Sequence, residues 1–183
     1  MKTRLYVWDP LVRLFHWSLV AAFLSNAFLT RPGKEVHEWV GYAVAGLIAL
    51  WLVWGLVGPR HARFADFPPA PGAAVGHLAE IAAGRRRAHA GHSPLGALMI
   101  YNLLLTMAAL ALTGWMQTTV SFFGVDWVEE LHEALVLWAE VSVVVHVAAV
   151  VIESRRLRVN LPKSMLTGYK DFTDPQVQPQ PPH

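Results

Sequence analysis

The sequence predicts an all-α integral membrane protein, a four-helix bundle with both termini in the cytoplasm. Of its 183 residues, 54% are hydrophobic and 15% are charged, and the mean hydropathy is +0.35. So few charges cannot cover the surface of a soluble domain that carries this many apolar side chains. The apolar residues gather in four stretches, each with about the 20 residues that a helix needs to cross a bilayer. The basic residues gather on one side of these stretches.

The four stretches give the elements in order along the chain. Each is predicted to be a helix, because backbone groups inside lipid must be hydrogen-bonded within their own segment. The apolar stretches are residues 11–29, 39–57, 95–116 and 131–152, and the corresponding spans cover about residues 10–30, 37–58, 95–117 and 130–152. Residues 1–171 are therefore expected to form one domain. Residues 172–183 are rich in Pro and Gln and are expected to be a disordered cytoplasmic tail.

The distribution of positive charge predicts the orientation of the helices. All but two of the 15 Lys and Arg residues lie at the N-terminus, in the loop of residues 58–94, or after the fourth span. The exceptions are Arg31 and Lys34. The positive-inside rule therefore places both termini and the long loop in the cytoplasm. The same asymmetry explains the isoelectric point near 9.2 without a nucleic-acid partner.

The long cytoplasmic loop contains one segment with helical spacing. Val75, Leu78 and Ile81 recur at intervals of three residues, and three consecutive Arg residues follow at 85–87. This pattern is typical of a short amphipathic helix that lies on an anionic membrane surface. A solvated connector without regular structure is equally consistent with it.

Histidines are the candidate metal ligands, because the chain has no Cys and so no disulfide, thiolate site, iron–sulfur cluster or c-type haem attachment. His16 and His146 lie toward the cytoplasmic ends of the first and fourth spans, and His37 and His132 toward the outer ends of the second and fourth. His132 and His146 point to nearly one face of their helix, about 21 Å apart along its axis. One His from each of two helices at equal depth suits bis-imidazole ligation of haem iron. The sequence thus predicts an inner tier (His16 with His146) and an outer tier (His37 with His132).

Other roles are open to these histidines. A single His in a membrane helix can hydrogen-bond a neighbouring helix, and His37 and His132 could be ordinary interfacial residues. One tetrahedral zinc site is excluded, because the four rings are divided between two levels. The remaining histidines are expected to be solvated or, at most, to contact haem propionates; they are His61, His77, His89, His92 and His183.

Two charged residues within the spans are also candidates for function. Arg13 lies one turn before His16, where it could pair with a propionate of an inner haem, although its place also suits a positive-inside anchor. Glu140 lies in the middle of the fourth span. It could relay the protons that quinol oxidation releases, or hydrogen-bond a neighbouring helix.

Six motifs carry a family resemblance. They are VWDPLVRLFHW (7–17), HEWVGY (37–42), GPRHARF (58–64), GHSPLG (91–96), LHE (131–133) and NLxxxMxTG (160–168). In this order and spacing they resemble bacterial cytochromes b561, and in particular the branch that includes the cytochrome b subunits of nickel–iron hydrogenases. The resemblance implies a four-helix membrane protein with two b-type haems, whose axial ligands are His16, His37, His132 and His146.

The resemblance also implies a function: electron transfer in the bacterial inner membrane between the quinone pool and a partner. A periplasmic c-type cytochrome or another redox subunit is expected, since the chain looks shorter than many hydrogenase-type subunits. A superoxide:quinone oxidoreductase and a haem-free membrane scaffold or transporter are the alternatives. Six acidic residues in the outer loops, against only Arg31 and Lys34, favour a basic cytochrome over the attraction of superoxide.

Overall fold

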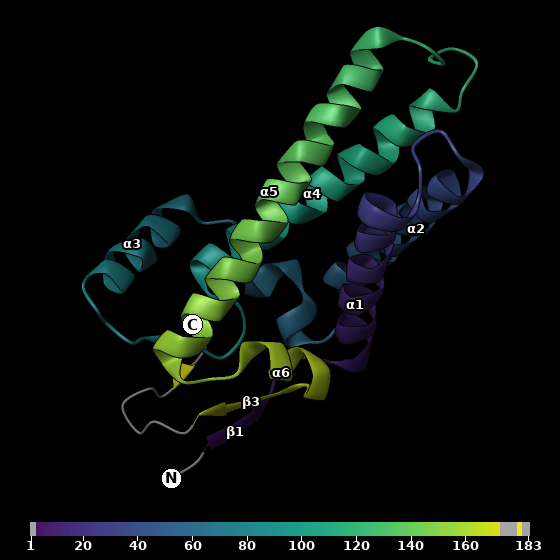
Figure 1. The fold of residues 1–183 in the computed structure, drawn as a ribbon. Helices are drawn as coiled ribbons and strands as arrows, with labels where there is room; N and C mark the ends of the chain where they lie inside the picture. Colours follow the sequence, from purple (N-terminus) through teal and green to yellow (C-terminus); the bar gives the residue numbers. More distant parts are fainter. Residues whose placement is uncertain (1–2, 173–178, 181–183) are drawn as a thin grey trace.

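The computed structural model describes residues 3–172 and 179–180, and four long helices dominate it. They are α1 (Pro10–Leu24), extended by the π-helical turn η1 (Ser25–Leu29), α2 (Glu35–Val57), α4 (Pro94–Gln117) and α5 (Asp126–Leu157). Each is long and apolar enough to cross a membrane, which confirms the four predicted spans. Helix α1 packs on α2, α2 on α4, and α4 on α5 (Figure 1).

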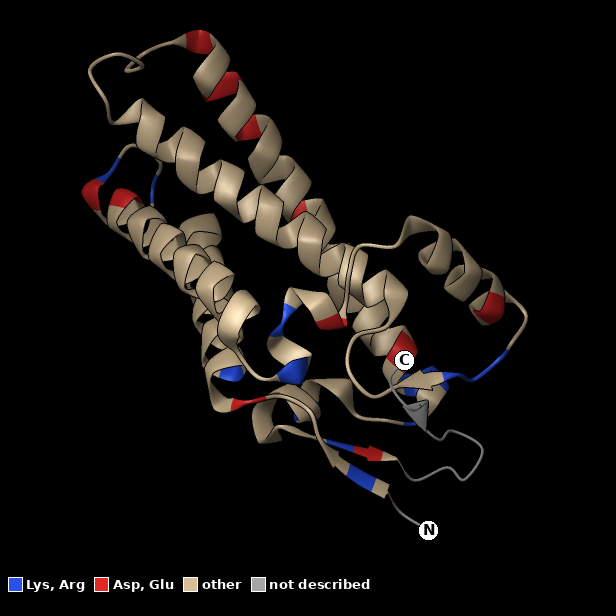
Figure 2. Cartoon of the chain, turned by 180° about the vertical axis from the view of Figure 1, so that it is seen from behind, with Lys and Arg blue, Asp and Glu red and all other residues tan. Residues whose placement is uncertain are grey.

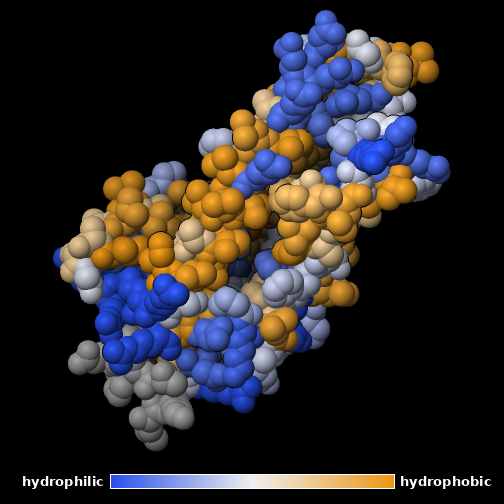
Figure 3. Space-filling model, in the orientation of Figure 1, coloured by the Kyte–Doolittle hydropathy of each residue, from blue (hydrophilic) through white to orange (hydrophobic). Residues whose placement is uncertain are grey.

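The surface of the bundle suits a lipid environment. Figure 3 shows a belt of hydrophobic residues around the middle of the molecule, with hydrophilic residues gathered toward both ends of the face in view. Large apolar side chains such as Leu105 and Val144 are exposed on α4 and α5. Helix α5 extends beyond the predicted span at both ends, and its 32 residues reach about 48 Å, more than the roughly 30 Å of a hydrocarbon core.

Local chemistry explains where the helices begin and how two of them are joined. Asp9 caps α1 by accepting from the backbone N–H of Leu11 and of Val12, and Pro10 occupies the first position, where no N–H is needed. Inside the bundle, Asn102 of α4 donates to the Ser142 hydroxyl of α5 at 2.9 Å. A satisfied polar pair of this kind can join two helices in lipid.

A compact unit closes one end of the bundle, and we call it the base. It consists of β1 (Thr3–Tyr6), α6 (Leu161–Thr167) and β3 (Tyr169–Phe172), and β1 pairs antiparallel with β3. The indole N–H of Trp8 donates to the Ser164 hydroxyl at 3.1 Å, which fixes α6 to the start of α1. Both ends of the described chain therefore meet at the same end of the bundle.

The long loop between α2 and α4 also has regular structure. It contains η2 (Arg60–Ala62), η3 (Phe64–Asp66), α3 (Pro71–Ala82) and β2 (Ala88–His89), and β2 pairs in parallel with β4 (Pro179–Gln180). The helix predicted in this loop is confirmed, and its position on a membrane surface stays a prediction. On α3, Val75 and Leu78 face outward, whereas His77 is buried against the protein.

The prediction of an all-α bundle therefore needs two additions. Two short helices, α3 and α6, lie outside the four spans, and two short two-stranded sheets form from β1 with β3 and from β2 with β4. These strands were missed because each pairs with a partner far away in the sequence. Of the expected tail, residues 173–178 and 181–183 lie outside the described residues.

Candidate functional site

Histidines from three helices meet in two pairs. His16 of α1 lies close enough to His146 of α5 for the two rings to interact electrostatically, and His37 of α2 is similarly close to His132 of α5. His16 and His146 are nearer the base, and the other pair is toward the opposite end. The structure thus places together the histidines that the sequence pairs, with α5 contributing one ring to each pair, and their role as haem ligands stays a prediction.

In the outer tier, the His132 ring is held by a threonine of the neighbouring helix. The Thr113 hydroxyl lies 2.8 Å from His132 Nδ1 and also donates to the Ala109 carbonyl, at 2.8 Å. A hydroxyl has one proton to give, and this one is committed to the carbonyl one turn earlier. With that proton directed at the carbonyl, Thr113 has lone pairs that can accept from Nδ1–H of His132. This tautomer leaves Nε2 with a free lone pair, the state that a metal requires.

The His37 ring is held in the same way by the turn that precedes it. The Thr30 hydroxyl lies 3.0 Å from His37 Nδ1 and 3.0 Å from Asn26 Oδ1, to which it can donate. The Asn26 amide in turn donates to the His37 carbonyl at 3.1 Å, which fixes which of its ends is the acceptor. With its proton directed at Asn26 Oδ1, Thr30 has lone pairs that can accept from Nδ1–H of His37. Both outer rings thus leave Nε2 available.

The π-helical turn η1 makes the second of these contacts possible. It ends α1 at residues 25–29 and brings Asn26 and Thr30 back toward the first turn of α2. Such turns are rare and are frequent at functional sites, because the extra residue re-aims the side chains around it.

The inner tier is arranged differently. Within the described part of the chain, neither His16 nor His146 has a hydrogen-bond partner on its ring, and His16 Nδ1 is buried. Arg13 lies one turn before His16, as predicted, and donates to the Leu166 carbonyl of α6 at 2.5 Å. Its Nε is buried and has no partner among the residues described. Contact between Arg13 and a propionate stays a prediction.

Comparison with known proteins assigns the chain to a family. A family model for prokaryotic cytochrome b561 matches residues 7–168, which is nearly the whole chain. The protein belongs to the prokaryotic cytochrome b561 family. This confirms the resemblance seen in the sequence and makes the protein a b-type cytochrome of the prokaryotic membrane that acts in electron transfer. No curated protein and no solved structure matches the chain.

The residues of this cytochrome fit the haem that its family implies. His16 offers a buried ring nitrogen without a partner, and both outer rings present Nε2. A side chain at Gly114 would contact the His132 ring, with its Cβ 3.4 Å from Cε1, whereas one at Gly41 would meet open space. No group of three or more His, Cys, Asp or Glu that could hold a metal ion occurs among the described residues. Paired imidazoles suit a porphyrin iron better than a tetrahedral ion.

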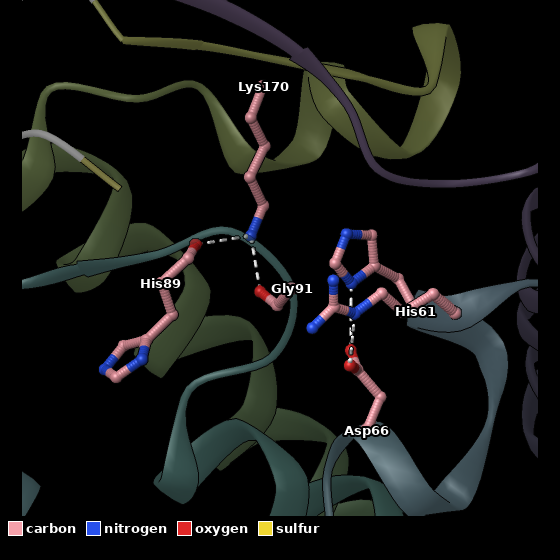
Figure 4. A network of polar contacts seen from close by, with 6 residues as sticks. His61, Asp66, His89, Gly91 and Lys170 are labelled. Carbon is pink, nitrogen blue, oxygen red and sulfur yellow. Dashed lines mark hydrogen bonds and ion pairs between the residues drawn. The ribbon is translucent and has the colours of Figure 1, made fainter. Parts of the chain in front are cut away.

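The histidines of the cytochrome's long loop are not solvated, and that expectation is wrong. His77 is only 4% exposed and lies edge-on to His89 at 5.4 Å between ring centroids. His92 is enclosed between the rings of Trp8 and Phe67, and its burial lowers its pKa to about 3. The His61 Nδ1 lies at hydrogen-bond distance, 2.9 Å, from Oδ2 of Asp66 (Figure 4). His183 lies outside the described residues.

A buried lysine connects this loop to the base. Lys170 of β3 donates from Nζ to the carbonyls of His89 and Gly91, at 3.3 and 2.6 Å (Figure 4). Its side chain is 6% exposed and crosses the Trp8 ring, 5.0 Å from the centroid. Burial lowers the pKa of this amine to about 8. The burial of Lys170 is not visible in the sequence, because it depends on the pairing of β1 with β3.

Glu140 lies on the exposed face of α5. It has neither a hydrogen bond nor an ion pair with any residue that the structure describes, so the expected bond to a neighbouring helix is not found. Its participation in proton transfer stays a prediction.

Proposed function

We propose that this protein is a dihaem cytochrome b of the bacterial inner membrane that transfers electrons between the quinone pool and a redox partner. The observation that carries the proposal is the division of four membrane histidines into two pairs along α5. His16 with His146 would hold one haem b, and His37 with His132 would hold the other. Each haem, when bound, supplies a one-electron iron couple.

The protein's own residues determine what chemistry is possible at each tier. An imidazole on both faces would leave no open coordination position, which favours electron transfer over reactions with oxygen. In the outer tier, the two threonine hydroxyls lie against Nδ1 of each ring and would leave Nε2 to bind the haem iron. All four rings are partly buried among apolar helices, and burial is one of the means by which a protein sets a redox potential.

The charge distribution supports an orientation with the base in the cytoplasm. Figure 2 shows most Lys and Arg residues around the base, whereas Arg31 and Lys34 lie in the segment between η1 and α2 at the opposite end. By the positive-inside rule the outer tier then faces the periplasm. The first turns of α2 and α5 there carry Glu35, Glu38, Asp126 and Glu129. These acids support a basic partner, such as a periplasmic c-type cytochrome or another redox subunit, and disfavour the attraction of superoxide.

Haem stoichiometry tests the proposal. We expect two haem b per chain from the pyridine haemochrome of the purified full-length protein, and one from His146→Ala or His132→Ala. His183→Ala, which removes a histidine outside the four spans, is the matched control and should retain two. Fewer than two haems in a fully loaded wild-type preparation, or no loss in either ligand variant, would refute the dihaem assignment. A haem-free scaffold would bind none.

A second measurement distinguishes the electron donors. Quinol and superoxide are added separately to the oxidised protein, and haem reduction is followed by absorbance. We expect reduction by quinol. Rapid reduction by superoxide alone would overturn the proposed role in favour of the superoxide:quinone oxidoreductase.

A further inference from the structure

The hydroxyls of Thr113 and Thr30 occupy equivalent positions on opposite sides of the outer tier. Each lies at hydrogen-bond distance from the Nδ1 of one outer histidine, and each has a different acceptor for its own proton. They come from unrelated elements, the C-terminal part of α4 and the residue after η1. The inner rings have no corresponding partner in the described part of the chain.

We propose that Thr113 and Thr30 are positioning residues that lower the midpoint potential of the outer haem through its histidine ligands. This inference rests on the proposed function, since it requires that His37 and His132 bind the haem iron. It assigns to two threonines a role that neither the family match nor the histidine pairing implies.

The physical reason is the effect of a hydrogen bond on the ligand. An imidazole that donates from Nδ1 to an acceptor becomes more basic at Nε2, because negative charge is shifted toward the metal side of the ring. A more basic ligand stabilises the ferric state relative to the ferrous state. Thr113 is 4% exposed, and a hydrogen bond is electrostatically stronger in such a low-dielectric setting than in water.

Because each threonine proton has another acceptor, the hydroxyl is expected to accept from the ring, and so to lower the potential of the outer haem rather than raise it. If Thr113 were free to rotate, it could donate to the ring and would then favour the opposite tautomer. Its hydroxyl donates instead to the Ala109 carbonyl, one turn earlier in the same helix, which leaves only lone pairs for His132. The acceptor of the Thr30 proton is Asn26 Oδ1, which is oriented by the bond from the Asn26 amide to the His37 carbonyl.

The test is a redox titration of the full-length protein with two bound haems. Thr113→Val removes the hydroxyl at nearly constant volume. We expect it to raise the outer potential, so that the ratio of reduced to oxidised outer haem at a fixed ambient potential increases by up to about tenfold. The midpoint potential of the inner haem, the second wave of the titration, should not change. Thr113→Ser should restore the wild-type value, and Thr30→Val should shift the outer wave in the same direction.

The same helix offers a matched control. The Thr106 hydroxyl donates to the Asn102 carbonyl at 2.7 Å, one turn earlier, and Thr106 is buried like Thr113, but it has no hydrogen bond to a histidine among the described residues. Thr106→Val should leave both waves unchanged. The outer wave is identified by its absence in His132→Ala, and low-spin ferric signals in electron paramagnetic resonance give an independent measure of the ligand field.

The outcomes separate the inference from the proposed function. Two haems with an unchanged outer potential in both Thr113→Val and Thr30→Val would overturn the role of the threonines and leave the dihaem function intact. Fewer than two haems in the wild type would overturn the function itself. If Thr113→Val releases the outer haem, the test rests on Thr30→Val. An unchanged outer potential in that variant would overturn the role of the threonines. An equal shift in Thr106→Val would show a general effect of the substitution and would also refute the inference.

Discussion

The two tiers share helix α5 but differ in what holds their rings in place. In the outer tier each imidazole is fixed individually, by a threonine hydroxyl at Nδ1. In the inner tier the helix of His16 is fixed by the base, since Arg13 and Trp17 of α1 donate to backbone carbonyls of α6. The comparison shows two ways to orient a histidine ring: hydrogen bonds to the ring itself, or packing of the helix that bears it.

The base should therefore matter more to the inner tier than to the outer one, and Trp8→Ala tests this most strongly. Trp8 is buried, donates to Ser164 and lies against His92 and Lys170. Its truncation leaves a cavity and removes the hydrogen bond to the Ser164 hydroxyl, so we expect a loss of about 3–5 kcal/mol in unfolding free energy. The inner haem spectrum should change while the outer one persists.

Thermal unfolding in detergent, with haem absorbance as a second readout, measures both effects. Trp115→Ala is the matched control, because Trp115 of α4 is 51% exposed on a span. We expect the control to cost less than about 1 kcal/mol. Equal destabilisation by the two variants, or a change confined to the outer haem, would contradict the division of roles between the tiers.

Lys170 gives the base a stability that depends on pH. Because burial lowers its pKa to about 8 from 10.5, the unfolded chain binds more protons than the folded one between these values. The free energy of unfolding should thus rise from pH 8 to pH 10.5, by up to about 3 kcal/mol. Below pH 8 the amine is charged in both states, and the full cost of burying its charge applies. Lys170→Met, compared with wild type across this range, should lack the rise. Parallel curves for the two proteins would show that the amine is not perturbed.

His92 should make the base sensitive to acid. Its pKa is lowered to about 3, first by burial and then by Lys170 and His61, so the unfolded chain binds an extra proton between pH 6.5 and 3. The stability that His92 contributes is complete above pH 6.5 and falls by about 1.4 kcal/mol per pH unit below it. His92→Phe keeps a ring between Trp8 and Phe67 and should give a shallower decline in the unfolding midpoint below pH 6.5. An identical acid profile in the variant would argue against burial of His92.

Features that depend on neighbouring residues can be predicted from the sequence, whereas contacts between residues far apart in the chain cannot. Hydropathy and the 3.6-residue period are local, and they suffice for the four spans and for placing His132 and His146 on one face. The base is not local: Trp8 and Ser164 are 156 residues apart in the chain. No periodicity of either segment indicates that they meet, so the burial of Lys170 and His92 is not visible in the sequence.

The threonines show the same limit within the candidate site. Thr113 is 19 residues from His132, and their contact depends on which faces α4 and α5 present to each other. Thr30 is only seven residues from His37. A polar residue at that distance before a ligand, separated from it by a tight turn, is a signal that sequence reasoning could have used. The π-helical geometry of η1, which completes the contact, has no such signal.

The smallest expected effect concerns Arg13, which links the base directly to the inner tier. One guanidinium nitrogen donates to the Leu166 carbonyl, and the buried Nε has no partner among the described residues. A positive charge one turn from His16 disfavours the ferric state, so Arg13→Gln should lower the midpoint potential of the inner haem. The corresponding change in the free energy of reduction should be less than about 1 kcal/mol. Arg13→Lys, which keeps the charge, should retain most of the wild-type value. A redox titration resolves the two waves, and movement of the outer wave instead of the inner one would show that Arg13 acts through the fold of α1 rather than through its charge.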